Sequence, residues 1–98
     1  LLKALGPEGH VVNISRGSAI DEDALIDALK SGTIAGAGLD VFENEPTPRA
    51  DLVNLPNIVV MPHLGGGTSE AIVAMGDAVI ANLDAFFSGK PLPNPVTA

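Results

Sequence analysis

Apolar and polar residues follow a strand pattern in three short segments and a helical pattern in a fourth. Residues 11–15 (VVNIS) are mainly β-branched and lie between glycines, so they predict a strand. Residues 34–41 (IAGAGLDV) and 57–61 (NIVVM) predict two more. Residues 22–31 carry apolar side chains at helical spacing. Asp21 precedes them as a predicted N-cap, and Gly32 follows them as the predicted stop. A strand, a helix, a strand, a crossover and a strand predict an α/β fold with a parallel sheet.

The end of the chain has a longer helical pattern. A glycine run, residues 65–67, leads to Thr68 as a predicted N-cap, and Gly89 ends the helix. The apolar residues in between recur at steps of three and four, which predicts one long helix with a stripe that packs in a core. This stripe consists of Ile72, Met75, Val79, Leu83 and Phe86. The prolines after the helix predict an extended tail.

Charge and composition narrow the classes of function. The net charge is −7, and the five basic residues are scattered, so nucleic acid and anionic membranes are not expected partners. The chain has no cysteine, which excludes disulfides and cysteine nucleophiles and is compatible with the cytoplasm. No apolar run approaches the ~20 residues that span a bilayer. Because the chain opens with Leu1 rather than methionine, we expect a fragment or a processed product.

Four ionisable residues follow the predicted strands. Arg16 follows the first, Asp40 ends the second with Glu45 just beyond it, and His63 follows the third. Ligands of open α/β sheets bind outside the carboxyl ends of the strands, so we expect these residues to share one cleft. Arginine binds a carboxylate through two parallel hydrogen bonds, and histidine exchanges a proton near neutral pH. A carboxylate beside the histidine favours the imidazolium, so the set suits a 2-oxo acid.

Three ordered motifs give the chain a resemblance to a known family. They are residues 12–17 (VNISRG), 38–46 (GLDVFENEP) and 55–65 (LPNIVVMPHLG). In this order and at this spacing they resemble the arginine, acidic and histidine motifs of the D-isomer-specific 2-hydroxyacid dehydrogenases. The resemblance continues into the tail, at residues 89–92 and 94–96.

The resemblance implies the C-terminal half of a Rossmann-like, doubly wound parallel sheet, with about three strands and flanking helices. Residues 1–66 would be the second half of a dinucleotide-binding domain, and residues 67–98 a long helix and tail that return toward a substrate domain. No G-x-G-x-x-G fingerprint occurs in the chain. We therefore expect the pyrophosphate loop upstream, outside this chain, and expect the chain alone to be inactive.

The same resemblance implies roles for individual residues. Arg16 would bind the substrate carboxylate and carbonyl, His63 would be the acid–base residue, and Glu45 rather than Glu43 would be its partner. The reaction implied is reversible hydride transfer between NAD or NADP and a 2-oxo or D-2-hydroxy acid, in a parent protein that forms a homodimer. The expected cofactor-binding residues are Ser15, Arg16, Asp40, His63, Gly65 and Gly66.

Other interpretations stay open at this point. The chain could be a non-enzymatic interaction or oligomerisation module that kept the half-fold. A metal site of His63 with Asp40 or Glu45 ranks last, because metal sites usually have more than one His or Cys and only His10 remains. The sequence decides neither the particular 2-oxo acid nor the choice between NAD and NADP.

Overall fold

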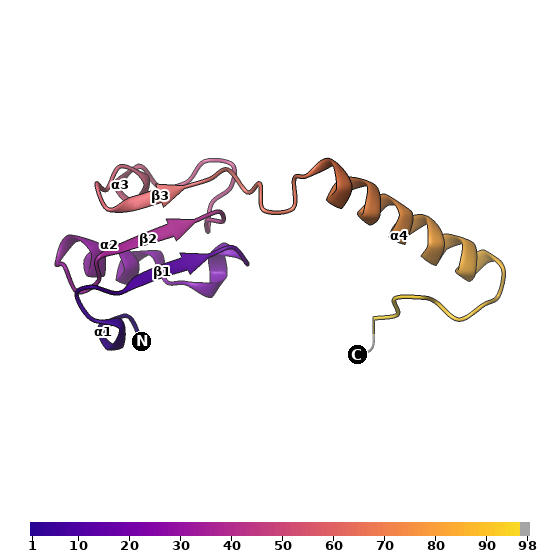
Figure 1. Ribbon diagram of the computed structural model, residues 1–98, viewed down its shortest axis with the longest axis horizontal. Helices are drawn as coiled ribbons and strands as arrows, with labels where there is room; N and C mark the ends of the chain where they lie inside the picture. Colours follow the sequence, from indigo (N-terminus) through magenta and orange to yellow (C-terminus); the bar gives the residue numbers. More distant parts are fainter. Residues whose placement is uncertain (97–98) are drawn as a thin grey trace. The chain divides into compact units, whose positions relative to one another are not determined.

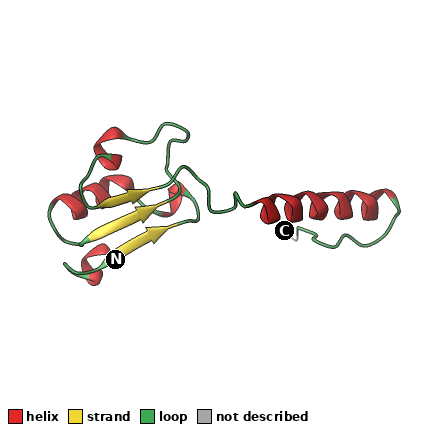
Figure 2. Ribbon diagram, turned by 45° about the horizontal axis from the view of Figure 1, so that its top comes forward, coloured by secondary structure: helices red, strands yellow, loops and turns green. Residues whose placement is uncertain are grey.

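The computed structural model describes residues 1–96, and the chain divides into two compact units, Leu1–Gly65 and Gly66–Ala98 (Figure 1). The first unit contains a sheet with short helices, and the second contains a single long helix (Figure 2). In chain order the elements of the first unit are α1 (Leu2–Leu5), β1 (His10–Asn13), the 3-10 helix η1 (Gly17–Ala19), α2 (Glu22–Lys30), β2 (Gly36–Leu39), α3 (Ala50–Val53) and β3 (Ile58–Val60).

The three strands form one parallel sheet in the order β1-β2-β3. Gly38 of β2 pairs with Val12 of β1 on one side and with Val59 of β3 on the other. The predicted α/β class and the parallel sheet are confirmed. The strands are shorter than the sequence predicts, and η1 was not predicted.

Helix α2 forms where the pattern predicts it, and its two ends explain why. The Asp21 side chain accepts a hydrogen bond from the Ala24 N–H, which satisfies one of the free donors at the helix start. Gly32, just past the end, has a φ of 69°, a left-handed conformation that glycine adopts without strain. The predicted cap and the predicted stop are both confirmed.

The core of the first unit lies between α2, α3 and one face of the sheet. Leu25 of α2, Ile34 before β2 and Leu52 of α3 are almost completely buried in it. The other face of the sheet carries Val12 and Val59, which are 70% and 69% exposed. A parallel sheet normally has both faces covered, and within the described residues this one is covered on a single face.

The second unit is built on α4 (Ser69–Phe87), which begins and ends as the sequence predicts. The Thr68 hydroxyl accepts a hydrogen bond from the Ala71 N–H, and Gly89 has a φ of 65°. The tail touches the helix where Asn82 and Asn94 exchange two hydrogen bonds. Among the described residues, α4 is not long and apolar enough to cross a membrane, and neither is any other helix.

The expected core packing of the apolar stripe on α4 is not observed in the described structure. Met75 and Phe86 are 57% and 66% exposed, and the other stripe residues are similar. Among the described residues of this unit, Ala85 alone is buried. The last two residues of the predicted tail, Thr97 and Ala98, lie outside the described residues.

Candidate active site

The loop after β1 is held by Asn13, which is only 5% exposed. Its side-chain oxygen accepts hydrogen bonds from the backbone N–H and the hydroxyl of Ser15, at 3.1 and 2.9 Å. Its amide nitrogen donates to the Arg16 carbonyl at 2.8 Å. The backbone that carries Arg16 is therefore fixed, while the Arg16 side chain stays exposed and donates to the Ser15 carbonyl at 2.6 Å.

A second fixed point joins the end of β2 to the turn after β3. Asp40 is 5% exposed, and its two oxygens accept hydrogen bonds from the backbone N–H groups of Leu64 and Gly65, at 2.8 and 2.7 Å. The residue before this pair, His63, has a φ of 56°, which is uncommon for a residue with a side chain. Asp40 thus holds the turn in which His63 takes its left-handed backbone.

The side chains of Glu45 and His63 meet at this edge of the sheet. Glu45 Oε2 lies 2.6 Å from His63 Nδ1, and Glu45 Oε1 accepts a hydrogen bond from the Phe42 N–H at 3.0 Å. Both side chains are partly exposed, at 35% for Glu45 and 47% for His63. The hydrogen bond from His63, followed by that from Phe42, lowers the pKa of Glu45 below its ordinary value, and the charge of Arg16 adds a smaller effect. Glu45 is therefore an ionised carboxylate at neutral pH.

An apolar pocket of about 320 Å³ borders this pair. Phe42, Val53 and Met61 line it together with prolines, and Glu45 and His63 are its ionisable residues. Arg16 does not line it.

The structure brings together the predicted site residues to different degrees. Glu45 and His63 are in contact, and Arg16 is close enough for its charge to act on Glu45. Asp40 packs closely against the turn that follows His63. The Cβ of a residue replacing Gly65 would come within 2.9 Å of an Asp40 oxygen. The other predicted residues are Ser15, bound to Asn13, and Gly66, which opens the second unit. In residues 1–96 no three His, Cys, Asp or Glu side chains are grouped so as to hold a metal ion.

Two residues that shape the site were not recognised as such in the sequence. A Cβ at Gly17 would lie 2.1 Å from the backbone of Phe42, so the arginine loop and the acidic loop touch there. Glu22 is 4% exposed and accepts a hydrogen bond from the Glu43 N–H. It lies three and four residues before the buried Leu25 and Ile26, a spacing that places it on the buried face of α2.

Comparison with known proteins identifies the family. Residues 1–65 match the model of the D-isomer specific 2-hydroxyacid dehydrogenase, NAD binding domain. A hydroxyphenylpyruvate reductase from Plectranthus scutellarioides is 51% identical over 96 residues, which are 98% of this chain and 31% of that protein. A glyoxylate reductase from Thermococcus litoralis is 50% identical over 95 residues, 97% of this chain and 29% of that protein.

Solved structures agree with these relatives. The NADPH-dependent glyoxylate/hydroxypyruvate reductase from Sinorhizobium meliloti, solved in complex with NADP and malonate, superposes with a TM-score of 0.93 at 49% identity. The match covers 98% of this chain and 30% of that one. The chain spans about a third of the length of the relatives it matches. It belongs to the D-isomer-specific 2-hydroxyacid dehydrogenase family, with a Rossmann-like NAD-binding fold in residues 1–65.

Proposed function

We propose that this chain is the nicotinamide-facing part of an NAD(P)-dependent reductase that converts a small 2-oxo acid to a D-2-hydroxy acid. The observation that carries the proposal is the 2.6 Å contact between Glu45 and His63, with the exposed Arg16 at the same edge of the sheet. Relatives named as reductases of hydroxyphenylpyruvate and glyoxylate support the substrate class. Because the chain spans about a third of those relatives, the activity is proposed for the whole protein.

His63 is the proposed proton donor in the reducing direction. Its Nδ1 is engaged by Glu45, so Nε2 is the ring nitrogen left to face a substrate. The ionised Glu45 stabilises the imidazolium, and its second oxygen is held by Phe42, so the ring keeps one orientation. His63 would give its proton to the carbonyl oxygen as negative charge develops there.

Arg16 is the proposed anchor of the substrate. Its guanidinium makes no ion pair within residues 1–96, and its one hydrogen bond, to the Ser15 carbonyl, leaves donors available. A planar guanidinium can bind the carboxylate of a 2-oxo acid by two parallel hydrogen bonds, and it stabilises charge on the adjacent carbonyl oxygen. The hydrogen bonds of Asn13 to Ser15 and to the Arg16 carbonyl fix the backbone that carries this side chain.

The residues present fit the nicotinamide end of a dinucleotide. Each oxygen of Asp40 accepts one backbone hydrogen bond and keeps capacity for a second, as an amide donor requires. Exposed backbone follows at Gly66, where an added Cβ would meet nothing within 4 Å. We propose that Ser15, Arg16, Asp40, His63, Gly65 and Gly66 hold this end. When bound, the dinucleotide supplies the hydride, and residues outside this chain hold its pyrophosphate.

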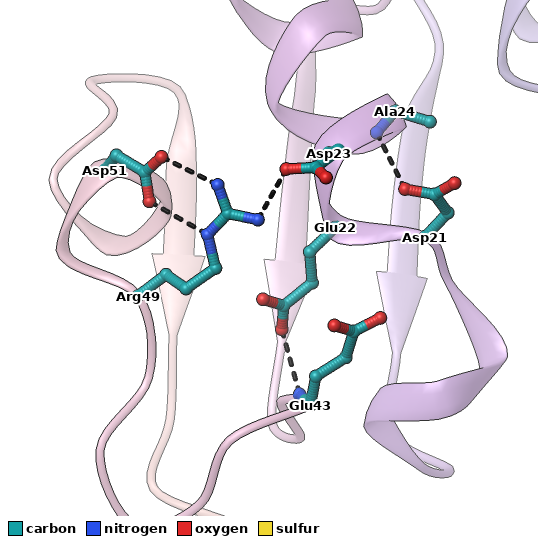
Figure 3. A network of polar contacts seen from close by, with 7 residues as sticks. All are labelled: Asp21, Glu22, Asp23, Ala24, Glu43, Arg49 and Asp51. Atoms are coloured by element: carbon teal, nitrogen blue, oxygen red, sulfur yellow. Dashed lines mark hydrogen bonds and ion pairs between the residues drawn. The ribbon is translucent and has the colours of Figure 1, made fainter.

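Arg16→Lys in the whole protein tests the proposal. Lysine keeps the charge but cannot reproduce two parallel hydrogen bonds, so kcat/KM should fall at least about tenfold. NADH affinity should change much less, because Arg16 is one of several residues proposed at the nicotinamide end. The matched control is Arg49→Lys, because Arg49 binds Asp23 and Asp51 instead of the site (Figure 3). It should leave kcat/KM near normal. If Arg16→Lys also has normal kinetics, the anchor role is rejected. A whole protein without reductase activity would instead favour the non-enzymatic interaction module.

His63→Gln in the same protein tests the acid–base role. It should lower kcat by ~10²–10⁴-fold, the usual contribution of general acid–base catalysis, and should change the Kd for NADH much less, because His63 is one of several residues proposed at the nicotinamide end. A fall in NADH affinity without a loss of kcat would assign His63 to cofactor binding alone.

We further propose that the whole protein is a homodimer located in the cytoplasm. The scarcity of basic residues and the absence of cysteine are compatible with this, and the reductases named above are its relatives. Light scattering of the purified whole protein gives the oligomeric state, and fractionation of cells gives the compartment.

A further inference from the structure

Glu22 occupies a place that its position at a helix end does not require. It begins α2 between Asp21 and Asp23, which are both exposed and already supply negative charge to the first turn. Glu22 is instead 4% exposed, and its Oε2 is buried with no hydrogen-bond partner among the described residues. A buried carboxylate oxygen without a hydrogen-bond partner costs free energy. The burial of Glu22 therefore needs an explanation, and the contact of its other oxygen supplies one.

That other oxygen reaches the acidic motif. Glu22 Oε1 accepts a hydrogen bond from the Glu43 N–H at 2.9 Å, across 21 positions of the chain (Figure 3). The donor is the Glu43 backbone N–H and not its side chain, so the bond fixes backbone and does not pair two carboxylates. The residue before, Phe42, donates its N–H to Glu45. Two consecutive backbone donors of this loop thus end on two carboxylates, one from α2 and one from the site.

A second contact holds the same loop from the same direction. Gly17 follows Arg16, and its backbone lies so close to Phe42 and Glu43 that even a methyl group would not fit. The segment after β1 therefore binds the loop after β2 twice, through contact at Gly17 and through the Glu22 hydrogen bond. Glu45 follows Glu43 by two residues in this loop, and its side chain contacts His63.

We propose that Glu22 is a positioning residue whose carboxylate fixes the backbone of residues 42–45, so that Glu45 is held against His63. It touches neither of these side chains, and it acts through the loop. The contact between Glu22 and residues 42–45 is observed in the structure of this chain. Its effect on catalysis rests on the proposed function.

The test uses four variants of this chain. Glu22→Ala removes the acceptor. Glu22→Asp keeps the charge but shortens the side chain by one methylene. Glu22→Gln keeps a side-chain oxygen that can accept from Glu43. Asp21→Ala is the matched control, because it removes the helix cap and lowers stability without touching the loop.

The readout is the titration of the Glu45 side-chain carboxyl, followed by carbon NMR. His63 and Arg16 act on the charge of Glu45. Asp40 and Glu43 precede it in the chain, and Glu22 binds its loop through the Glu43 N–H. In Glu22→Ala and Glu22→Asp the pKa of Glu45 should rise toward its ordinary value, because the loop no longer holds the carboxylate against His63. Loss of the Glu22 charge alone would act in the opposite direction, lowering the pKa of Glu45. Glu22→Gln keeps the loop in place and removes only the charge, so it should leave the pKa of Glu45 unchanged or slightly lower. Asp21→Ala should leave the titration of Glu45 as it is in the unchanged chain.

Kinetics of the whole protein give the second readout. Glu22→Ala and Glu22→Asp should lower kcat several-fold with little change in the Kd for NADH, and Glu22→Gln should restore most of the loss. An unmoved Glu45 titration in Glu22→Ala or Glu22→Asp, or the same titration shift in Asp21→Ala, would overturn the positioning role. If the whole protein has no reductase activity, the proposed function fails, and the NMR result still decides whether Glu22 positions Glu45.

Discussion

The two units of the chain contain similar proportions of apolar side chains but use them in opposite ways. In residues 1–65 the apolar residues of α2 and α3 meet the sheet and form a core, in which Leu25 and Leu52 are fully buried. In residues 66–96 the large apolar residues of α4 stay exposed, and Phe87 is 82% exposed. The difference teaches that helical periodicity predicts the helix, and that burial depends on what a neighbouring element offers.

Identical leucine substitutions should separate the two units most strongly. Leu25→Ala leaves a cavity in the core and should lower the free energy of unfolding by about 2–5 kcal/mol. Leu83→Ala removes a side chain that is 51% exposed, and its effect should stay within about 0.5 kcal/mol. Urea unfolding of the 98-residue chain, followed by circular dichroism, measures both. Equal losses would show that Leu83 is packed in solution and would abolish the contrast.

Glycine substitutions should even differ in sign between the units. At Gly17 an added methyl group collides with the backbone of Phe42, so Gly17→Ala should lower the free energy of unfolding by about 1–3 kcal/mol. At Gly76, inside α4, an added methyl group meets nothing within 4 Å. Gly76→Ala should therefore stabilise the helix by up to about 1 kcal/mol, because alanine has the higher helix propensity. Thermal melts of both variants give the signs, and a neutral Gly17→Ala would contradict the close approach.

The smallest expected difference concerns pH. The pKa of Glu45 is lowered in the folded chain, mainly by its hydrogen bond with His63, so the contribution of Glu45 to stability is present above the ordinary glutamate pKa of about 4.3. That contribution is lost as the pH falls through the lowered pKa of Glu45, because the carboxylate then becomes protonated. Glu45→Gln should reduce this acid sensitivity, whereas Glu70→Gln in the first turn of α4 should change it less. Unfolding free energies at several pH values between about 3 and 6 check this, and identical pH dependence in the two variants would count against the Glu45–His63 bond.

Features set by neighbouring residues in the sequence were predicted well. Asp21 and Thr68 cap their helices, and Gly32 and Gly89 end them, because each signal acts within a few residues of its own position. The strands were predicted at the right places but too long. Residues 34–41 contain β2, which spans only Gly36–Leu39, the four residues that pair with β1.

The candidate site divides in the same way. The motifs indicated Arg16, Glu45 and His63, and the structure brings Glu45 and His63 into contact. The residues that hold them were missed, because their contacts join distant parts of the chain. Glu22 reaches Glu43 across 21 positions, and no local pattern records such a contact. The core packing predicted for the apolar stripe of α4 was not observed for a related reason. The spacing of the apolar residues contains no information about what covers them.

The parallel arrangement of β1, β2 and β3 also places the candidate site at one end of the strands and leaves the other end available for labelling. All three strands run the same way, so the loops with Arg16, Asp40 and His63 lie at their carboxyl ends. The link from α2 to β2 lies at the opposite end of the sheet (Figure 1). Lys30 is exposed in that link region, and the chain has no cysteine of its own. A single thiol introduced by Lys30→Cys would therefore accept one fluorophore, which could report the folding of the first unit while the opposite edge remains free for ligands.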